Sequence, residues 1–463
     1  MKEELYQLLS DHGQEHVLAF WDSLLPVERE ALAEEIRAID FELLESLYAS
    51  AGEETDWHAL ADRAGPPRAF RLDTTRNPFS PEQACRRAGE ALSAGRMGVV
   101  LVAGGQGSRL GFDHPKGMFP IGPVSGKSLF QIHLEKIVAL SRQYGAPVPL
   151  YLMTSPATHE ETVAFLQEHD RFGLPEEDLN IFCQGTMPAV DAETGKLILA
   201  QRHALCLSPD GHGGMLQALS QSGYLEEMSR RGIEHLFYFQ VDNPLVDIGD
   251  EEFLGYHLLS DSELSSQVIA KRDPLEKVGN VVEVDGRLRI IEYSDLPDEA
   301  ARRRNPDGSL VIWAGSIAVH AMEVAFLRRM ADRADALPFH VARKKVPHLT
   351  PSGQWVDPKQ PNAIKFERFI FDLLPSARNA VVVEVDPKRR FAPLKNASGE
   401  KQDTPEAVRA QMAAEHADWL RRAGAEVEDE IPVEISPLFA RNAGQLAKKI
   451  PPGLRVNEPR YFC

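Results

Sequence analysis

Apolar and polar residues follow one another along the middle of the chain in a pattern that predicts strands and helices in turn. Residues 99–103 form a short, continuous apolar run, which is typical of a parallel strand covered on both faces. Residues 148–153 and 233–241 are further apolar runs, while residues 129–140 carry apolar side chains at helical spacing. This alternation predicts a doubly wound α/β domain, in which the ligand binds beyond the carboxyl ends of the strands.

The two ends of the chain show different patterns. Before residue 95, leucine, valine and isoleucine recur at helical spacing, which predicts a helical region. After residue 390, a loop rich in proline and lysine precedes a short helical segment and proline-punctuated strands, which predicts a small mixed α/β domain. We therefore expect a helical N-terminal region (1–95), a central domain (96–390) and a small C-terminal domain (391–463).

The composition excludes several classes of function. A formal net charge of −18 over 463 residues argues against a general surface for nucleic acids or anionic membranes, so an anionic substrate has to be attracted by local cations. No apolar run approaches the length of a membrane span, and the first residues lack the features of a signal peptide, so we expect a cytoplasmic protein. The 4 cysteines have no paired spacing and predict neither a disulfide framework nor a zinc site.

A glycine-rich loop follows the apolar run at 99–103. Gly104, Gly105 and Gly107 have no Cβ, so backbone N–H groups there can converge on an anion. Glycines alone are also compatible with a simple turn, but two cations, Arg109 and Lys116, follow closely. A strand, a glycine turn and two cations together predict a phosphate-binding cradle.

This loop matches neither of two common phosphate motifs. The dinucleotide fingerprint is excluded because one residue too many separates Gly107 from Gly111. The Walker loop is excluded at residues 122–128, where one residue too few separates the glycines. The cradle must therefore be of another kind.

An acidic residue, Asp242, ends the apolar run at 233–241. A carboxylate at the end of a buried strand beside a phosphate cradle suits Mg²⁺, which binds through hard oxygen ligands, with phosphate and water supplying the rest. The alternative is an aspartate that caps a turn before Pro244.

The glycine loop carries a resemblance to a known family. Residues 104–111, Gly-Gly-Gln-Gly-Ser-Arg-Leu-Gly, with Pro-Lys-Gly at 115–117, resemble the signature of the nucleotide-sugar pyrophosphorylases. More narrowly, they resemble the UDP-N-acetylhexosamine pyrophosphorylases within the UDP-glucose pyrophosphorylase superfamily. The resemblance implies a Rossmann-like, GT-A-like nucleotidyltransferase domain. It also implies UTP and a hexose 1-phosphate as substrates, Mg²⁺ as cofactor, and a UDP-sugar and pyrophosphate as products.

On the UTP side, the resemblance implies a role for several strand and loop ends. Asp242 matches the metal-binding motif and is expected to hold Mg²⁺ against the α-phosphate, and Lys365 matches a lysine that binds UTP phosphates. Gln184 and Gly211 match positions that contact uridine, with ordinary turn chemistry as the alternative. The expected UTP-binding residues are Val102, Ala103, Gly104, Gly105, Lys116, Gln184, Gly211, Asp242 and Lys365.

On the sugar side, Glu292 and Tyr293 resemble the family's sugar-binding pair, and Lys395 lies in a loop that carries a cation to the sugar phosphate. Phe369 and Phe371 are implied to border the acyl pocket, with core packing as the alternative. The expected sugar-binding residues are His212, Glu292, Tyr293, Trp313, Phe369, Phe371 and Lys395.

The implied reaction is an in-line displacement in which a phosphate oxygen of the sugar 1-phosphate attacks the α-phosphorus of UTP. Because the nucleophile is already an anion, catalysis then requires positioning and neutralisation of charge. The expected catalytic residues are Arg109, Lys116, Lys365 and Lys395.

Two departures from the family pattern leave the sugar open. His212 stands where the N-acetylhexosamine enzymes carry asparagine, and Trp313 begins a Trp-Ala-Gly-Ser stretch in place of Asn-Ala-Gly-Asn. The sequence therefore favours UDP-N-acetylglucosamine as product, with UDP-glucose, UDP-galactose or a broad range of UDP-sugars as the alternative. A nucleotide-sugar sensor without turnover is an alternative of another class. We expect a monomer or a weak homo-oligomer.

Overall fold

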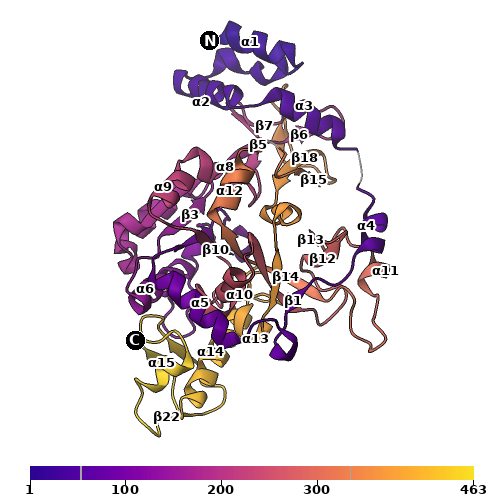
Figure 1. The fold of residues 1–463 in the computed structure, drawn as a ribbon. Coiled ribbons are helices and arrows are strands. Elements are labelled where there is room, and N and C mark those ends of the chain that lie inside the picture. Colours follow the sequence, from indigo (N-terminus) through magenta and orange to yellow (C-terminus); the bar gives the residue numbers. More distant parts are fainter. Residues whose placement is uncertain (53–54, 334) are drawn as a thin grey trace. The chain divides into compact units, whose positions relative to one another are not determined.

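The computed structural model describes residues 1–52, 55–333 and 335–463 (Figure 1). The chain divides into two compact units, each built from three segments. The first unit comprises Met1–Asp56, Gln184–Gln217 and Ala334–Asp372, and the second comprises Trp57–Cys183, Ala218–Arg333 and Leu373–Cys463. The expected limits at residues 95 and 390 remain predictions.

The second unit is built on a large sheet with the strand order β1-β19-β11-β14-β10-β2-β3-β4. Its strands pair in parallel, except that β14 runs antiparallel to its neighbours and carries the hairpin β12–β13. The strands are β1 (Ala69–Phe70), β2 (Met97–Val102), β3 (Leu150–Thr154), β4 (Leu179–Cys183), β10 (His235–Gln240), β11 (Leu264–Ala270), β12 (Asn280–Val284), β13 (Arg287–Ile291), β14 (Ala314–Glu323) and β19 (Val381–Glu384). The predicted α/β class with a parallel central sheet is confirmed.

Helices with one apolar side cover this sheet. α5 begins with a capping box between Ser80 and Gln83, and α6 is capped by Ser128 and ends at Gly145, whose φ of +64° suits glycine. Buried residues of α5, α6 and α10 join those of β2 and β10 in one apolar core. The helices are α5 (Pro81–Ser93), α6 (Leu129–Tyr144), α7 (His159–Glu168), α9 (Tyr224–Arg230), α10 (Glu251–Leu259) and α12 (Val324–Ala331).

Two smaller clusters complete the second unit. α4 (Trp57–Arg63) and α11 (Asp298–Ala301) pack with the β12–β13 hairpin around buried alanines and valines. The C-terminal residues form their own apolar cluster, in which strands as short as β21 pair with β23. The helices and strands after residue 386 are α13 (Pro387–Arg390), α14 (Pro405–Arg422), β20 (Glu426–Val427), β21 (Val433–Ile435), α15 (Ala443–Ala447), β22 (Arg455–Val456) and β23 (Arg460–Phe462).

The first unit combines N-terminal helices with small antiparallel sheets. Its core joins Leu5, Leu9 and Leu32 of the helices to Val190 and Ile364 of the strands. Its helices are α1 (Lys2–Asp11), α2 (Pro26–Arg37) and α3 (Phe41–Ser50), and α8 (Gly214–Gln221) leads out of the unit. Its strands are β5 (Thr186–Pro188), β6 (Val190–Asp191), β7 (Leu199–Gln201), β8 (Ala204–Leu205), β9 (Leu207–Pro209), β15 (Phe339–Lys344), β16 (His348–Leu349), β17 (Trp355–Val356) and β18 (Ala363–Arg368).

The parallel strands of the large sheet bring several chain segments to one edge. β2, β10, β11 and β19 all end there, and β14, which runs the other way, begins there. The residues that follow these ends are therefore neighbours, although they are far apart in the sequence. Within the described ranges, no helix is long and apolar enough to cross a membrane.

Candidate active site

The glycine loop opens from the carboxyl end of β2 and folds back on itself. The amide of Gly107 donates to the carbonyl of His114 at 2.9 Å, and the amide of Lys116 donates to the carbonyl of Gly105 at 3.0 Å. A Cβ on Gly107 would lie 2.7 Å from the carbonyl oxygen of Phe112, so a larger residue would push the two arms apart. The loop is thus a closed, glycine-dependent structure.

The glycine loop, where a phosphate cradle is predicted, has backbone donors that are not used within the described structure. Ala103 donates to the carbonyl of Met153 at 2.8 Å, which fixes the start of the loop beside β3. Within the described ranges, the amides of Gly104, Gly105 and Gln106 donate to no other residue. Successive unpaired amides at a strand end can bind a phosphate oxygen. Val102 and Ala103 support this cradle from the strand.

Asp242 follows β10, the strand next to β2 in the sheet. Its side chain is partly buried, and none of the residues that the structure describes donates a hydrogen bond to its carboxylate. Its carbonyl accepts a 2.8 Å hydrogen bond from the amide of Leu394. This bond brings the loop of Lys395 to the end of β10.

Lys116 and Lys395 meet at the same place. The ammonium of Lys116 donates to the carbonyl of Leu394 at 3.4 Å, and Lys395 itself is exposed. The structure therefore brings the cradle, Asp242 and two predicted lysines together. Arg109 is exposed in the short helix η4 (Ser108–Leu110) and forms no ion pair with any described residue, so its charge is available to a ligand.

Asp403 is a member of this group that the sequence did not single out. Its carbonyl accepts from the amides of Lys395 and Asn396 at 2.9 and 3.0 Å, and its φ of +57° is unusual for a residue other than glycine. Burial raises the pKa of Asp403, Lys395 lowers it, and the carboxylate of Asp242 raises it, so both charges are near. In the sequence, Asp403 is marked only by its position directly before Thr404, the residue that caps α14.

Glu292 and Tyr293 follow β13 near the start of β14. A Cβ added to Gly279 would lie 3.2 Å from the Oε1 atom of Glu292 and 3.8 Å from the Cβ of Ser316, so these three residues share one small region. Tyr293 is 50% exposed. The predicted sugar-binding pair thus lies close to the stretch that departs from the family pattern.

Trp313 lies directly before β14, and Arg71, the residue that follows β1, lies over its indole ring. The guanidinium of Arg71 lies 3.7 Å from the centre of the indole ring and donates to Glu384 at 2.7 Å. One face of the Trp313 ring is therefore occupied by a cation. Sequence reasoning missed Arg71, because no local pattern links it to Trp313.

Lys271, after β11, was also missed. Its ammonium donates to the side-chain oxygen of Asn280 at 2.5 Å and to the carbonyl of Pro274 at 3.1 Å, and its amide donates to the carbonyl of Trp313. Burial lowers the pKa of Lys271 to about 8. This lysine ties the loop after β11 to the hairpin that leads to Glu292.

The predicted uridine-contacting residues belong to the first unit. Gln184 is buried, and the next residue, Gly185, accepts a hydrogen bond from the amide of Asp210 at 3.1 Å. Asp210 also binds Arg368, whose amide and guanidinium donate to its carbonyl and its Oδ2 atom at 2.8 and 2.6 Å. Gly211 has a φ of +84°, and any Cβ there would collide with the backbone of Arg368.

The predicted aromatic residues of the first unit form one cluster. The ring centre of His212 lies 5.3 Å from that of Phe369 and 5.6 Å from that of Phe371, and His340 lies 4.6 Å from Phe369. Burial, and the neighbouring His340, lower the pKa of His212 to about 4. His212 is therefore neutral near pH 7, and its Nδ1 atom accepts from the amide of Ile370 at 3.3 Å.

Lys365 lies in the middle of β18, opposite Ala342 of β15. Burial raises the pKa of Cys206 to about 11, and the charge of Lys365 acts in the opposite direction, so the ammonium lies near this thiol. The first unit thus contains predicted residues for both substrates: Gln184, Gly211 and Lys365 for UTP, and His212, Phe369 and Phe371 for the sugar.

Comparisons with known proteins decide the family. A family model described as "UTP--glucose-1-phosphate uridylyltransferase" matches residues 70–412. The chain belongs to this family. The resemblance carried by the glycine loop is confirmed, and the uridylyltransferase family places the chain among the enzymes that transfer a uridylyl group from UTP to a sugar 1-phosphate.

Named relatives of this uridylyltransferase cover most of its length. It is 37% identical over 441 residues to "UDP-N-acetylhexosamine pyrophosphorylase-like protein 1" of Xenopus tropicalis, covering 91% of this chain and 85% of the relative. It is 34% identical to "UDP-N-acetylglucosamine pyrophosphorylase" of Saccharomyces cerevisiae, with 93% of each chain covered. A solved structure titled as a putative UDP-N-acetylglucosamine pyrophosphorylase from Entamoeba histolytica has a TM-score of 0.79 and 32% identity, and the match covers 86% of this chain and 100% of that chain.

Proposed function

We propose that this uridylyltransferase makes UDP-N-acetylglucosamine, or a related UDP-N-acetylhexosamine, and pyrophosphate from UTP and the sugar 1-phosphate. The observation that carries the proposal is the cradle of unpaired amides at residues 104–106, with Lys116 and the Lys395 loop bound around Asp242. The names of the Xenopus and yeast relatives support the N-acetylated sugar.

The chain's contribution to the reaction is position and positive charge. A phosphate oxygen of the sugar 1-phosphate attacks the α-phosphorus of UTP, and the bond from that phosphorus to the bridging oxygen of pyrophosphate breaks. The attacking oxygen carries no proton that must be removed, so a general base and a covalent enzyme intermediate are unnecessary. Arg109 and Lys116 neutralise the leaving pyrophosphate, and Lys365 and Lys395 hold the phosphates of the bound substrates.

Asp242 is the residue that would hold Mg²⁺. Its carboxylate is not engaged by any described residue, it lies at the strand end nearest the cradle, and Asp403 adds a second acidic group within electrostatic reach. Mg²⁺ commonly binds proteins through one or two carboxylates, with substrate phosphates and water completing its coordination, so these residues fit the ion. When bound, Mg²⁺ would supply neutralising charge at the α-phosphate.

The residues proposed to bind the sugar are found in each unit: near the start of β14 in the second unit, and in the aromatic cluster of the first. Glu292 would accept hydroxyl hydrogen bonds, and Phe369 and Phe371 would border the acyl group. His212 and Trp313 are the two positions that favour the alternative of glucose, galactose or a broad specificity, because both depart from the pattern of the N-acetylhexosamine enzymes.

The test is Mg²⁺-dependent pyrophosphate release from UTP with N-acetylglucosamine, N-acetylgalactosamine, glucose and galactose 1-phosphates. A preference for the N-acetylated sugars supports the proposal. A preference for glucose or galactose overturns the choice of sugar and makes His212 and Trp313 the specificity determinants. UTP binding without turnover of any of them would instead favour the nucleotide-sugar sensor. The cytoplasmic location and the monomeric or weakly associated state remain predictions.

A further inference from the structure

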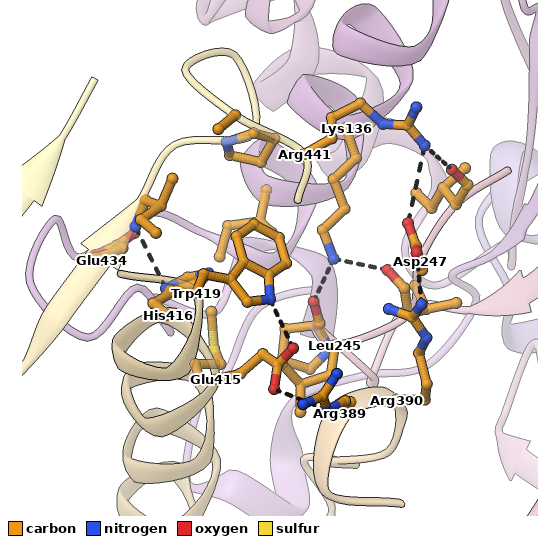
Figure 2. Close-up of a pocket in the computed structure, with 18 residues that line it drawn as sticks. Lys136, Leu245, Asp247, Arg389, Arg390, Glu415, His416, Trp419, Glu434 and Arg441 are labelled. Atoms are coloured by element: carbon orange, nitrogen blue, oxygen red, sulfur yellow. Dashed lines mark hydrogen bonds and ion pairs between the residues drawn. The ribbon is translucent and has the colours of Figure 1, made fainter. Parts of the chain in front are cut away.

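Lys136 is a lysine in the middle of α6 whose charge none of the predicted roles uses. Its ammonium donates to the carbonyl of Pro244 at 2.6 Å and to the carbonyl of Val246 at 2.7 Å. Both carbonyls belong to the loop that follows Asp242. Figure 2 shows the lysine extending from α6 toward this loop, with two hydrogen bonds at its tip.

The residue one turn earlier in α6 holds the other side of Asp242. His133 is completely buried, and its Nε2 atom donates to the carbonyl of Val241 at 3.0 Å. Burial lowers the pKa of His133 to about 3, so the ring is neutral and this nitrogen carries the proton that the carbonyl accepts. Residues three apart on a helix lie on the same side, so His133 and Lys136 form one polar edge facing the segment 241–246.

Packing and hydrogen bonds together hold this segment: Leu245 and Val246 are buried in the apolar core, and Lys136 binds two of the segment's carbonyls. A pocket of about 60 Å³ lies there, lined by Lys136, Leu245 and Trp419 among others, so apolar contacts are incomplete on that side (Figure 2). The ammonium accordingly supplies contacts that side-chain packing does not. Placing a charge there is costly, and an apolar side chain of the same length would fill the space at lower cost.

We propose that Lys136, assisted by His133, is a positioning residue that fixes the main chain on both sides of Asp242 and so sets where its carboxylate projects. This rests on the proposed function, in which Asp242 holds Mg²⁺. The ion requires near-ideal octahedral geometry at short oxygen distances, so a small displacement of one carboxylate weakens its binding. A misplacement of about 1 Å can cost on the order of 10²-fold in rate.

The test compares Lys136→Met with wild type in two measurements. The first is the affinity for Mn²⁺ in the presence of UTP, followed by the electron paramagnetic resonance of the free ion. The second is the Mg²⁺ concentration that gives half-maximal pyrophosphate release. We expect Lys136→Met to lower the affinity for Mn²⁺ about tenfold and to raise the Mg²⁺ concentration for half-maximal release about tenfold. The affinity for UTP without metal should change by less than about twofold.

Lys127→Met is the matched control. Lys127 is also partly buried and donates to both carboxylate oxygens of Glu135 at 2.6 Å, but it has no bond to the segment after Asp242. It should lower thermal stability without changing either metal measurement. If Lys136→Met does the same, the positioning role is overturned.

Two further variants keep the test decisive. Lys136→Gln can still donate a hydrogen bond, and it should fall between wild type and Lys136→Met in metal affinity; it also replaces Lys136→Met if that variant does not fold. An effect of Lys136→Gln on stability alone would count against the proposal. Asp242→Asn tests the metal role of Asp242 separately from the positioning role of Lys136. If its affinity for Mn²⁺ is unchanged, the metal role in the proposed function is refuted, whatever the result for the Lys136 variants.

Discussion

At the scale of single residues, the candidate site contains charged side chains that have few or no hydrogen bonds or ion pairs with the rest of the described structure. Lys116 has one long hydrogen bond to a carbonyl, Arg109 has no ion pair among the described residues, and the carboxylate of Asp242 accepts no hydrogen bond from them. Several other cations are paired with carboxylates, as Arg231 is with Asp178 and Arg368 is with Asp210. Charges that no described residue engages, gathered at one strand end, suit the binding of a charged ligand.

Replacing Arg109 or Lys116 by alanine should lower kcat by roughly 10²–10³, comparable to the loss of one oxyanion-hole donor. Each variant removes a cation from the charge that develops on the leaving pyrophosphate. Steady-state kinetics with saturating UTP and sugar 1-phosphate measures the effect. Arg142→Ala, which removes an exposed arginine near the end of α6, should leave kcat unchanged. Turnover near the wild-type rate in either site variant would refute its assigned role.

Lys136 gives a prediction about pH. Burial lowers the pKa of this lysine from 10.5 to about 7, so between these values the unfolded chain binds more protons than the folded one. Stability then rises with pH over this window, and the cost of burying the ammonium is largest below pH 7. As the pH rises through this window, the free energy of unfolding of wild type should increase relative to that of Lys136→Met by at most about 1.4 kcal/mol per pH unit. Parallel curves from denaturant titrations at several pH values would disprove it.

At the scale of elements, the loop before α8 depends on close contact with the end of β18. Gly211→Ala should raise the Kd for UTP about tenfold, because its Cβ would displace the backbone of Arg368. Its positive φ adds a further strain of about 1 kcal/mol. Gly126→Ala is the control, since Gly126 has a φ of +68° with no atom within 4 Å of an added Cβ. Calorimetric titration with UTP separates them, and equal Kd values would contradict the contact.

The elements themselves were largely predictable, since apolar spacing reports burial directly. The run at 99–103 became β2, the run at 233–241 became β10, and the predicted helix at 129–140 extends to Tyr144. The Asp-Gly turn at 285–286 joins β12 to β13, with positive φ at both residues. The roles of the predicted site residues are chemical assignments and remain predictions. Lys136, Asp403 and Arg71 could not be predicted, because their partners are distant in sequence and no local pattern marks them.

At the scale of the whole molecule, the C-terminal cluster is bound to the loop before α6 within the second unit. Glu434 in β21 is 3% exposed and accepts hydrogen bonds from the amides of Val124 and Ser125 at 2.8 and 2.6 Å, and from the Ser125 hydroxyl at 2.6 Å. These residues are 310 and 309 positions apart. The carboxylate therefore joins the end of the chain to the central sheet.

Glu434→Ala should lower the free energy of unfolding by at least about 2 kcal/mol, because buried donors lose a charged acceptor. Denaturant titration measures the change. Glu426→Ala, which removes an exposed partner of Arg455, should stay within about 0.5 kcal/mol of wild type. Equal stability of the two variants would show that the C-terminal cluster is held by its apolar contacts alone.

The first unit is built from three segments that are far apart in the sequence, and this affects its folding during synthesis. The core of that unit needs Leu5 and Leu32 from the N-terminal helices, and Ile364 and Phe366 from β18. A ribosome adds about 5–20 residues each second, so the helices emerge on the order of tens of seconds before that strand exists. During this interval their apolar sides lack the partners that β18 supplies. These helices are thus synthesised well before the strand that completes their core.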